Sequence, residues 1–372
     1  MNPQRVRLAR ASFRDFRNLE RLDVEFPDAG LAIVGENGQG KTNLLEGIYY
    51  MQVLRSVRGA RDQDLVRFGA PAFHVSSQVH TDSAHELSAG FETISKRKKV
   101  TRDGAVAARL SDAFGSFPSV MFSPRDVQLV AGGPGERRRF LDLVLALSSR
   151  RYLSALQHYR AALARRNAAL REAARGSADE TSVAVWEPAL AEHGATLILE
   201  RSRWIKEHES DFARLAAAIG EQDETTMDYA SSQKAEDDPR TALLSLFERQ
   251  RSHDIRRGMT HSGPHRDDLR LSLADRDLRL FGSAGQQRTA AIALRMLEGA
   301  TLRAACGLEP LLLLDDPFAE LDVRRSASIL ELLRSAGLGQ TVLVVPRESD
   351  IPPELLTLER RRIAGGRIED AA

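Results

Sequence analysis

The sequence predicts an α/β protein in which a mixed sheet is interrupted by a helical insertion, and three observations lead to this class. Strand-like apolar runs occupy the first part of the chain and return only near its end. Between them, apolar residues recur at helical spacing. A glycine-rich loop directly follows one of the apolar runs. The expected boundaries are 1–123 and 258–372 for the two parts of one core, and 124–257 for the helical insertion.

The elements of the first part follow from apolar alternation and turn residues. Val6 to Phe26 alternates around a turn and predicts an antiparallel hairpin. Leu31 to Val34 is a continuous apolar run, as expected of a strand buried on both faces, and Leu44 to Leu54 has helical spacing. His74 to Arg102 alternates again and predicts further strands, with Lys96 to Lys99 at the tip of a hairpin.

The middle of the chain has a helical period. One stripe lies between Glu136 and about Arg175, and it comprises Leu153, Leu156, Tyr159, Leu163 and Leu170. A second set recurs every seven residues and predicts one long helix through Ile198, Ile205, Phe212 and Ile219. The polar stretch from Glu221 to Pro239 predicts a loop. Strands return at Leu311 to Leu314 and Thr341 to Val345, and Cys306, on the helix before them, is expected to be a small core residue.

Composition excludes several classes of protein. The 372 residues are 42% hydrophobic and 28% charged, which allows a buried core and argues against global disorder. A single Cys cannot form an internal disulfide and is typical of a reducing compartment. The first residues contain no apolar signal-type region, and no apolar run approaches the length of a membrane span. We therefore expect a cytoplasmic protein without a membrane partner.

The charges are unevenly distributed along the chain. The 53 basic and 52 acidic residues give a net charge of +1. From Pro124 to Arg175, eleven Arg face four acidic residues, which gives +7; from Gly176 to Gln250, seven basic and sixteen acidic residues give −9. These two segments either pair with each other or form two separate surfaces. In the second case, the +7 segment is a candidate nucleic-acid-binding surface.

The glycine-rich loop carries the strongest chemical signal. Gly35 to Thr42 reads GENGQGKT and matches the phosphate-binding pattern G-x-x-x-x-G-K-[ST] between a strand and a helix. Its glycines let backbone N–H groups face phosphate oxygens, and the helix N-terminus adds partial positive charge. Lys41 is expected to reach the β- and γ-phosphates, and Thr42 to bind Mg²⁺.

Two further motifs fit a nucleotide site. Leu311 to Leu314 ends in Asp315 and Asp316, at the strand edge where α/β sheets bind ligands. Asp315 is positioned to hold Mg²⁺, and Asp316 to polarise the attacking water. Ser283 to Gln287 opens a clear helix, and it is interpreted either as a second phosphate-facing loop that completes another subunit's site or as a plain N-cap.

These motifs together resemble ABC-type ATPases of the SMC and Rad50 kind, and their order is most similar to the RecF family of bacterial recombination mediators. The shared segments are Phe16-Arg17-Asn18, GKTNLLE, SPRDVQLVAGGPGERRRFLD, RYLSALQHYRAALARRNAAL, GPHRDDL, SAGQQR and LLLLDDPFAELD. The resemblance spans nearly the whole chain. It implies an ABC-type ATPase head, a mixed sheet with a P-loop, plus an inserted helical arm domain.

The resemblance also implies roles for individual residues. Lys41 and Asp316 would be catalytic, Thr42 and Asp315 would bind Mg²⁺, and Asp322 would couple two sites. Gln63 is a candidate for the Gln-loop residue. The implied ATP contacts are Gly35, Glu36, Asn37, Gly38, Gln39, Gly40, Lys41 and Thr42 from one protomer, with Ser283, Gly285 and Gln286 from the other.

The family's behaviour implies the partners. ATP would close a homodimer on double-stranded DNA, at junctions with single-stranded gaps, and weak DNA-stimulated hydrolysis would release it. With RecR- and RecO-type proteins the chain would help to load RecA in DNA repair, in response to DNA damage (the SOS response) and during replication. Two alternatives remain: an SMC-like structural DNA clamp, and the nucleotide-binding subunit of an ABC transporter, which the 248 positions between Gly35 and Ser283 disfavour.

Several residues depart from the pattern or allow two interpretations. Asp316 is one methylene shorter than the Glu common in the superfamily. Pro346 and Arg347 follow the strand after the ELD loop, where a switch His is common in the superfamily, so slow hydrolysis is expected. For the His pair in THSGPHRDD, a structural or subunit-contact role is favoured over metal binding. The Arg triplet beside GGPGE is either paired with nearby acids or bound to phosphates. These residues are His261, His265, Arg137, Arg138 and Arg139.

Overall fold

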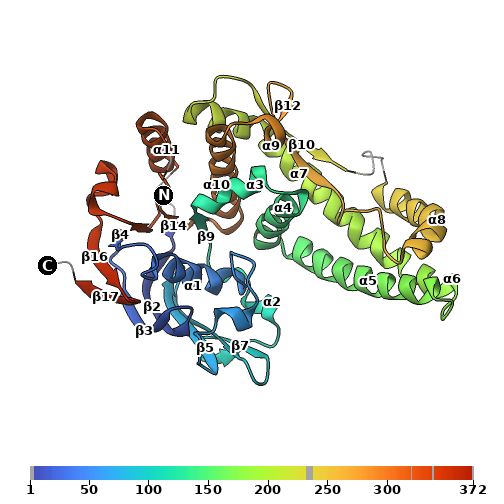
Figure 1. Ribbon diagram of the computed structural model, residues 1–372, viewed down its shortest axis with the longest axis horizontal. Helices are drawn as coiled ribbons and strands as arrows, with labels where there is room; N and C mark the ends of the chain where they lie inside the picture. The colour runs from blue at the N-terminus through green and yellow to red at the C-terminus, as the bar shows by residue number, and fades with distance from the viewer. Residues whose placement is uncertain (1–3, 232–237, 320, 337–338, 371–372) are drawn as a thin grey trace. The chain divides into compact units, whose positions relative to one another are not determined.

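The computed structural model describes residues 4–231, 238–319, 321–336 and 339–370, which form two compact units (Figure 1). The first unit combines Met1–Asp126 with Arg295–Ala372, and the second is Val127–Leu294. The second unit therefore ends at Leu294, whereas the sequence pattern predicts an end near residue 257. The cause is a strand pairing that the pattern does not reveal, because residues 268–273 belong to a sheet of the second unit.

A six-stranded sheet forms the centre of the first unit, in the order β17-β16-β4-β15-β14-β9. Four neighbouring strands run parallel and are buried at nearly every position, as expected for a sheet covered on both faces. These are β4 (Gly30–Val34), β15 (Thr341–Val345), β14 (Leu311–Asp315) and β9 (Ser119–Phe122). β16 (Glu359–Ala364) adds in parallel to β4, and β17 (Arg367–Asp370) returns antiparallel to it. The predicted strands at 31–34, 311–314 and 341–345 are confirmed.

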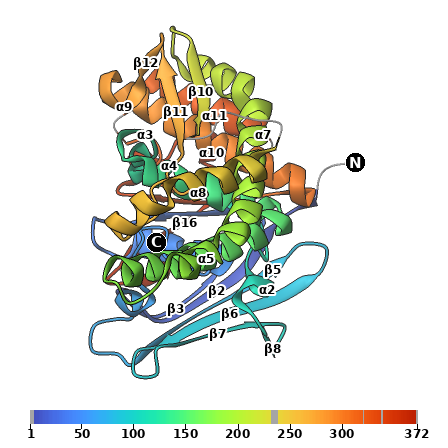
Figure 2. The same ribbon diagram turned by 90° about the vertical axis from the view of Figure 1, so that its right-hand side faces the viewer.

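A second six-stranded sheet of the first unit is antiparallel, in the order β3-β2-β5-β6-β7-β8, and Figure 2 shows its long strands side by side. Its hairpin of β2 (Arg7–Phe16) and β3 (Leu19–Glu25) confirms the prediction for residues 6–26. The strands predicted within 74–102 are also present, although Lys98 and Lys99 lie inside a strand rather than at the hairpin tip. These strands are β5 (Ala72–His80), β6 (Ala84–Glu92), β7 (Arg97–Arg102) and β8 (Ala105–Val106).

The helices of the first unit follow its central strands. α1 (Lys41–Val53) follows β4 directly, and α11 (Val323–Ser335) follows β14. α10 (Ala284–Cys306) begins in the second unit and ends in the first. Cys306, at its end, is exposed, so the prediction of a small core residue was wrong: the helix presents its last residues to solvent. The shorter elements are β1 (Gln4–Arg5), which pairs with β13 (Leu308–Glu309), η1 (Asp62–Leu65), α2 (Leu110–Ala113), η2 (Pro124–Val127), η3 (Glu348–Asp350) and η4 (Pro353–Leu355).

Helices dominate the second unit. The long ones are α4 (Pro134–Ser148), α5 (Arg150–Ala174), α7 (Glu187–Ile219) and α8 (Pro239–Arg257), with short α3 (Gln128–Ala131), α6 (Glu180–Ala184) and α9 (Leu278–Phe281). A three-stranded antiparallel sheet accompanies them: β10 (Thr225–Ala230), β11 (Asp268–Leu273) and β12 (Arg276–Asp277). The predicted loop at 221–239 was therefore wrong for β10, and residues 232–237 of that stretch lie outside the described part of the chain.

No described helix is both long and apolar enough to span a membrane. The hydrophobic stripe of α7 faces its own unit instead, since Ile198, Ile205, Phe212 and Ile219 are all buried there. The same holds on α5, where Leu153, Leu156, Tyr159 and Leu170 are buried. The long apolar periodicities of this chain are therefore packing faces within the second unit.

A candidate nucleotide site in the first unit

The glycine-rich loop turns between the end of β4 and the start of α1. Two of its glycines have positive φ angles, 82° at Gly38 and 111° at Gly40, a region that L side chains rarely adopt. A Cβ on Gly35 would lie 2.4 Å from the carbonyl oxygen of Ile363, so the loop also approaches β16 too closely for any other residue. Glu36, Asn37 and Gly38 are exposed at the tip.

Lys41, the first residue of α1, folds back over this loop. Its Nζ donates to the carbonyl oxygen of Glu36 at 2.8 Å and to that of Gly35. The side chain is 7% exposed, and burial lowers the pKa of the amine, while Asp315 and Asp316 oppose that shift. A largely desolvated cation held by the carbonyls of a glycine loop is suited to bind phosphate oxygens.

Thr42 and Asp315 meet at the ends of two different elements. The Thr42 Oγ1 donates to Asp315 Oδ1 at 3.0 Å. β15 lies between β4 and β14, so the sheet order brings the start of α1 to the carboxyl end of β14. Burial raises the pKa of Asp315 to about 6, against the opposing effect of the Thr42 hydrogen bond. A hydroxyl and a carboxylate in contact are oxygen ligands of the kind that Mg²⁺ prefers.

Asp316 follows with a left-handed backbone, at a φ of 44°. Its N–H donates to the carbonyl oxygen of Val344 at 2.9 Å, which ties this bend to β15. Asp adopts such a conformation more readily than most residues. The chain thus turns sharply between two consecutive carboxylates.

A ring of polar contacts anchors the loop to the first hairpin, and the sequence assigned none of these residues a role. Asn18 donates from Nδ2 to the carbonyl oxygen of Gly38 at 3.3 Å and accepts from Asn43 Nδ2 at 2.7 Å. Arg58 donates to Asn43 Oδ1 at 2.7 Å. The segment Phe16-Arg17-Asn18 was recognised only as a motif, and the spacing of the loop alone carries no signal for Asn43 or Arg58.

Glu46 closes this ring as a fully buried carboxylate on α1. Arg17 donates to both of its oxygens, at 3.1 and 3.2 Å, and Arg58 lies 3.4 Å from one of them. The Ser56 hydroxyl donates to it as well. Two cations and a hydroxyl around one buried carboxylate satisfy its charge and hold the hairpin against α1.

The turn between β16 and β17 also contacts the glycine-rich loop. The N–H of Gly365 donates to Gln39 Oε1 at 2.7 Å, and the N–H of Gly366 to the Gln39 carbonyl oxygen at 3.0 Å. A Cβ on Gly366 would lie 2.6 Å from the carbonyl oxygen of Asn18, so only glycine fits. Gln39 is thereby fixed in both its side chain and its backbone by the end of the chain.

The remaining site candidates lie elsewhere. Ser283 accepts from the N–H of Gln286 at 3.3 Å, and its own N–H donates to Gln286 Oε1 at 2.8 Å, which is a reciprocal capping box at the start of α10. This end of α10, with Gly285, belongs to the second unit, whereas Lys41, Thr42 and Asp315 belong to the first. Gln63 is exposed in η1.

The loop after β14 is described only in part. Asp322 caps α11 by accepting from the N–H of Arg325 at 2.8 Å. Glu320, of the same ELD loop, lies outside the described residues. The carboxylate of Asp322 therefore has a structural function at a helix start, whatever else it contacts.

The THSGPHRDD segment is a loop that the long helices of the second unit hold in place. The Tyr159 hydroxyl and His265 Nδ1 lie 2.7 Å apart, and burial lowers the pKa of His265 to about 4, so this imidazole is neutral at physiological pH. Arg201 is 2% exposed; it donates to the carbonyl oxygen of Pro264 and to Asp142 at 2.7 Å each. For His265, these contacts agree with a structural role.

The Arg triplet is divided between interior and surface. Arg137 is 5% exposed and donates to both carboxylate oxygens of Asp268, at 2.9 and 2.8 Å, so its charge is internally matched. Arg138 donates to the carbonyl oxygen of Asp267. Arg139 is exposed and pairs with Glu136. Pairing within the unit thus accounts for Arg137, and the triplet is not one continuous phosphate-binding surface.

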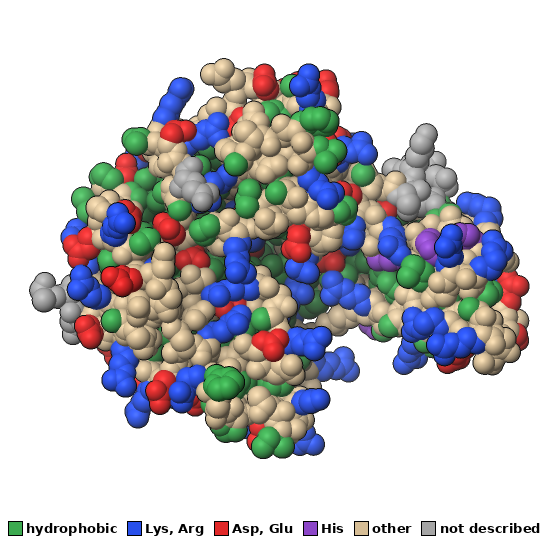
Figure 3. All heavy atoms as spheres, viewed as in Figure 1, with side chains coloured by type: hydrophobic (Ala, Val, Ile, Leu, Met, Phe, Trp, Pro, Cys, Tyr) green, Lys and Arg blue, Asp and Glu red, His purple; other side chains and the backbone are tan. Residues whose placement is uncertain are grey.

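Most of the exposed arginines of the +7 segment lie on α5. Arg150, Arg151, Arg160, Arg165 and Arg171 are exposed there, and Arg160 pairs with Asp142. Figure 3 shows Lys and Arg side chains across the visible face, mixed with Asp and Glu. The local excess of positive charge therefore reaches the surface chiefly along one helix of the second unit.

Comparisons with known proteins agree on one relationship. The family model described as the RecF/RecN/SMC N terminal domain matches residues 7–351. A protein of Lactobacillus delbrueckii subsp. bulgaricus named DNA replication and repair protein RecF is 35% identical over 361 residues, which is 95% of this chain and 94% of that protein. A protein of the same name from Chloroflexus aurantiacus is 36% identical over 385 residues, at 95% and 97% coverage.

Solved structures show the same likeness. A structure described as the recombination mediator protein RecF-ATP in the RecFOR pathway matches with a TM-score of 0.91 and 27% identity, over 100% of this chain and 99% of that one. An SMC head bound to a domain of ScpA matches with a TM-score of 0.55 and 14% identity, over 98% and 97% of the two chains, which supports the shared fold alone.

Proposed function

Because this chain belongs to the RecF family of DNA replication and repair proteins, we propose that it is an ATP-dependent, DNA-binding recombination mediator. ATP closes a homodimer on double-stranded DNA near single-stranded gaps, and slow, DNA-stimulated hydrolysis opens it again. With RecO- and RecR-type partners, the closed dimer assists the loading of RecA onto single-stranded DNA.

The contact between Thr42 Oγ1 and Asp315 Oδ1 carries the nucleotide part of this proposal. Thr42 and Asp315 would hold Mg²⁺, which supplies positive charge against the phosphates. Lys41 and the backbone N–H groups of the loop from Gly35 to Gly40 bind and orient the phosphates, and Asp316 orients the attacking water. The raised pKa of Asp315 suits a carboxylate whose charge is to be matched by a cation.

The start of α10 supports a site shared between two copies. Ser283 is exposed, so the N-terminal end of this long helix is open to an approaching ligand. Leu280 and Phe281, just before it, are 70% and 69% exposed, which is unusual for large apolar side chains in a monomer. We assign Ser283, Gly285 and Gln286 to the γ-phosphate of a second copy, and Leu280 and Phe281 to the contact around it.

Hydrolysis acts as a timer in this proposal. The carboxylate of Asp316 has a shorter reach than that of the Glu common in ABC-type ATPases. Pro346 and Arg347 follow β15, so the chain has no His at the position where many relatives carry a switch residue. Turnover of tens per second by the protein alone would contradict the timer, and dimers that form with ATP but never hydrolyse it would favour the structural clamp.

The decisive experiment measures oligomeric mass by light scattering, with and without ATP and duplex DNA, for the wild type and Lys41→Arg. The wild type is expected to dimerise only with ATP, and Lys41→Arg to remain monomeric because it loses the phosphate contact. Lys206→Arg, at an exposed position of α7, is the matched control and should behave as the wild type. A wild type that stays monomeric with ATP and DNA together would overturn the shared site.

A further inference from the structure

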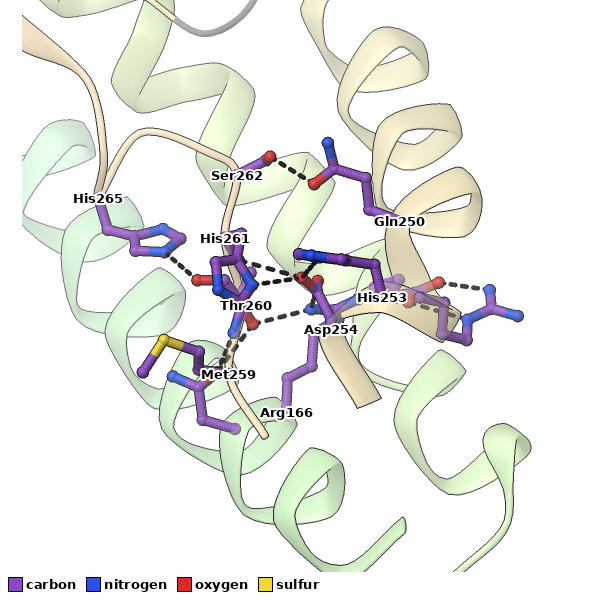
Figure 4. A network of polar contacts seen from close by, with 12 residues as sticks. Arg166, Gln250, His253, Asp254, Met259, Thr260, His261, Ser262 and His265 are labelled. Carbon is purple, nitrogen blue, oxygen red and sulfur yellow. Dashed lines mark hydrogen bonds and ion pairs between the residues drawn. The ribbon is translucent and has the colours of Figure 1, made fainter. Parts of the chain in front are cut away.

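The end of α8 and the loop after it bring two histidines and a carboxylate together, away from the nucleotide site. His253 and Asp254 are neighbours in the last turn of α8, and His261 lies on the following loop. One ligand atom from each of the three lies within 4.8 Å of the others. Figure 4 shows the His261 ring and the His253 side chain on either side of the Asp254 carboxylate.

The separations are close to those of a tetrahedral metal site. Asp254 Oδ1 is 3.0 Å from His261 Nδ1 and 4.0 Å from His253 Nδ1. Zinc–nitrogen and zinc–oxygen bonds of about 2.0–2.1 Å place ligand atoms about 3.3 Å apart on a tetrahedron. All three ligand atoms lie within 4.8 Å of one another. A shift of about 1–2 Å by the half-exposed side chain of His253 is therefore enough to complete three ligand positions, with water in the fourth.

A buried arginine fixes the orientation of the Asp254 carboxylate. Its Oδ2 accepts from Arg166 Nη1 at 2.7 Å, and both side chains are fully buried. The backbone N–H of His261 donates to Oδ1 at 3.2 Å. The carboxylate is thus oriented by one partner on α5 and presents its other oxygen to the two imidazoles, an arrangement that tunes metal ligands in many sites.

The charged side chains around the three ligands determine how tightly a metal ion is expected to bind. Arg166 also pairs with Glu187, and Arg251 pairs with the same Glu187. Together with Asp254, these side chains are two cations and two anions, so their charges cancel. The Asp254 charge is already shared with Arg166, which weakens the site relative to structural zinc. His253 and His261 are 48% and 32% exposed, so solvent screens the added charge. Histidine side chains reach the surface in the region of α8 in Figure 3.

We propose that His253, Asp254 and His261 bind one Zn²⁺ or a similar divalent transition metal. Imidazole nitrogen favours such ions over Mg²⁺ and Ca²⁺, which prefer oxygen ligands. The ion links the end of α8 to the loop that begins at Met259 and that continues into the GPHRDD element. Its binding stabilises the second unit and does not depend on the nucleotide.

Calorimetric titration of the untagged full chain with zinc chloride, without nucleotide or Mg²⁺, tests this proposal. One equivalent is expected to bind to the wild type, and His253→Ala, a partly exposed position, to weaken binding at least about tenfold. Zinc should also raise the melting temperature of the wild type and not that of His253→Ala. Cobalt bound in place of zinc should show the intense visible absorption of a tetrahedral site.

A second histidine pair provides the matched control. His158 and His193 stack at 4.9 Å between ring centroids, on α5 and α7. His193→Ala is expected to keep the zinc equivalent. The proposal is overturned if the wild type binds no zinc, if His253→Ala binds it as tightly as the wild type, or if His193→Ala removes it. In those cases His261 serves only as a hydrogen-bond donor to Asp254.

Discussion

The Thr42 hydroxyl and the Asp315 carboxylate, 273 positions apart, share a hydrogen bond of 3.0 Å. This contact joins the first turn of α1 to the last residue of β14, and the carboxylate is only 7% exposed. Burial raises the pKa of Asp315 to about 6, so the ionised carboxylate lowers the free energy of unfolding at neutral pH. The residue that we propose to hold Mg²⁺ therefore lowers the stability of the free protein at neutral pH.

Asp315→Asn is expected to stabilise the free protein while weakening its Mg²⁺-dependent binding of ATP. The folded pKa lies above the unfolded value of 3.8, so the penalty is absent at low pH and grows as the pH rises from about 4 to about 6. Above that window, the variant should gain on the order of 1–3 kcal/mol in free energy of unfolding. Urea unfolding of both proteins at several pH values measures the difference.

Asp142→Asn is the control, because it is expected to change the free energy of unfolding in the opposite direction. Burial acts to raise the pKa of Asp142, but Arg201 and the hydrogen bond from Tyr152 outweigh it, and the net pKa is lowered. Its charged form is stabilising at neutral pH, so Asp142→Asn should lower the free energy of unfolding there. Equal effects of the two substitutions would contradict the assignment for Asp315.

Asn18→Ala is expected to weaken ATP binding without removing any proposed phosphate contact. The substitution deletes the hydrogen bonds to Gly38 and from Asn43, and each contributes about 1 kcal/mol to the order of the loop. The expected loss in affinity, measured with a fluorescent ATP analogue, is about three- to tenfold. Asn167→Ala removes the acceptor of two hydrogen bonds from Thr260 in the second unit, so it should lower stability and leave ATP affinity unchanged.

Gly366→Ala should disturb the loop from the far end of the chain. Both Gly365 and Gly366 have positive φ, 54° and 76°, but only at Gly366 would a Cβ collide with the backbone of Asn18. The comparison with Gly365→Ala isolates the collision from the shared conformational strain. Thermal melts and ATP titrations should show a larger loss for Gly366→Ala; identical losses would mean that strain alone matters.

Charge reversal on α5 tests whether its exposed arginines contact DNA. Arg151→Glu together with Arg171→Glu is expected to weaken duplex binding and to reduce the salt slope by about 1–2, because each phosphate contact contributes about 0.9. Anisotropy of labelled duplex DNA over a salt series, with ATP present, measures both. Arg214→Glu, an equally exposed change on α7, is the control. An unchanged slope in the double variant would place the footprint elsewhere.

The strands and helices that carry the motifs were predictable because their signals are local. Leu31 to Val34 and Leu311 to Leu314 are continuous apolar runs, and the stripe of α7 has a clear seven-residue period. β10 was missed because its six residues alternate only weakly and resemble a polar loop. Its hydrogen bonds come from β11, whose paired residues lie 38 to 48 positions further along the chain. Strand pairing of that kind is decided by the partner.

The residues that hold the glycine-rich loop in place could not be predicted from the sequence for a related reason. Glu46, Asn43 and Arg58 are polar residues on or near a helix, and their types alone suggest a solvated surface. Only the folded hairpin brings Arg17 and Asn18 to them. Cys306 is the opposite case: its apolar neighbours in the sequence predicted a core position, but the side chain is exposed.

The turn at Gly365 and Gly366 has a consequence for synthesis on the ribosome. The antiparallel sheet needs only residues up to 106, so it can form while most of the chain is still being made. β4 emerges early as well, but its neighbours β15 and β16 follow about 300 residues later. The glycine loop of a nascent chain is therefore made long before the residues that fix Gln39. A message cut short near its end yields a protein whose loop keeps its contacts with Asn18 but lacks those with Gly365 and Gly366.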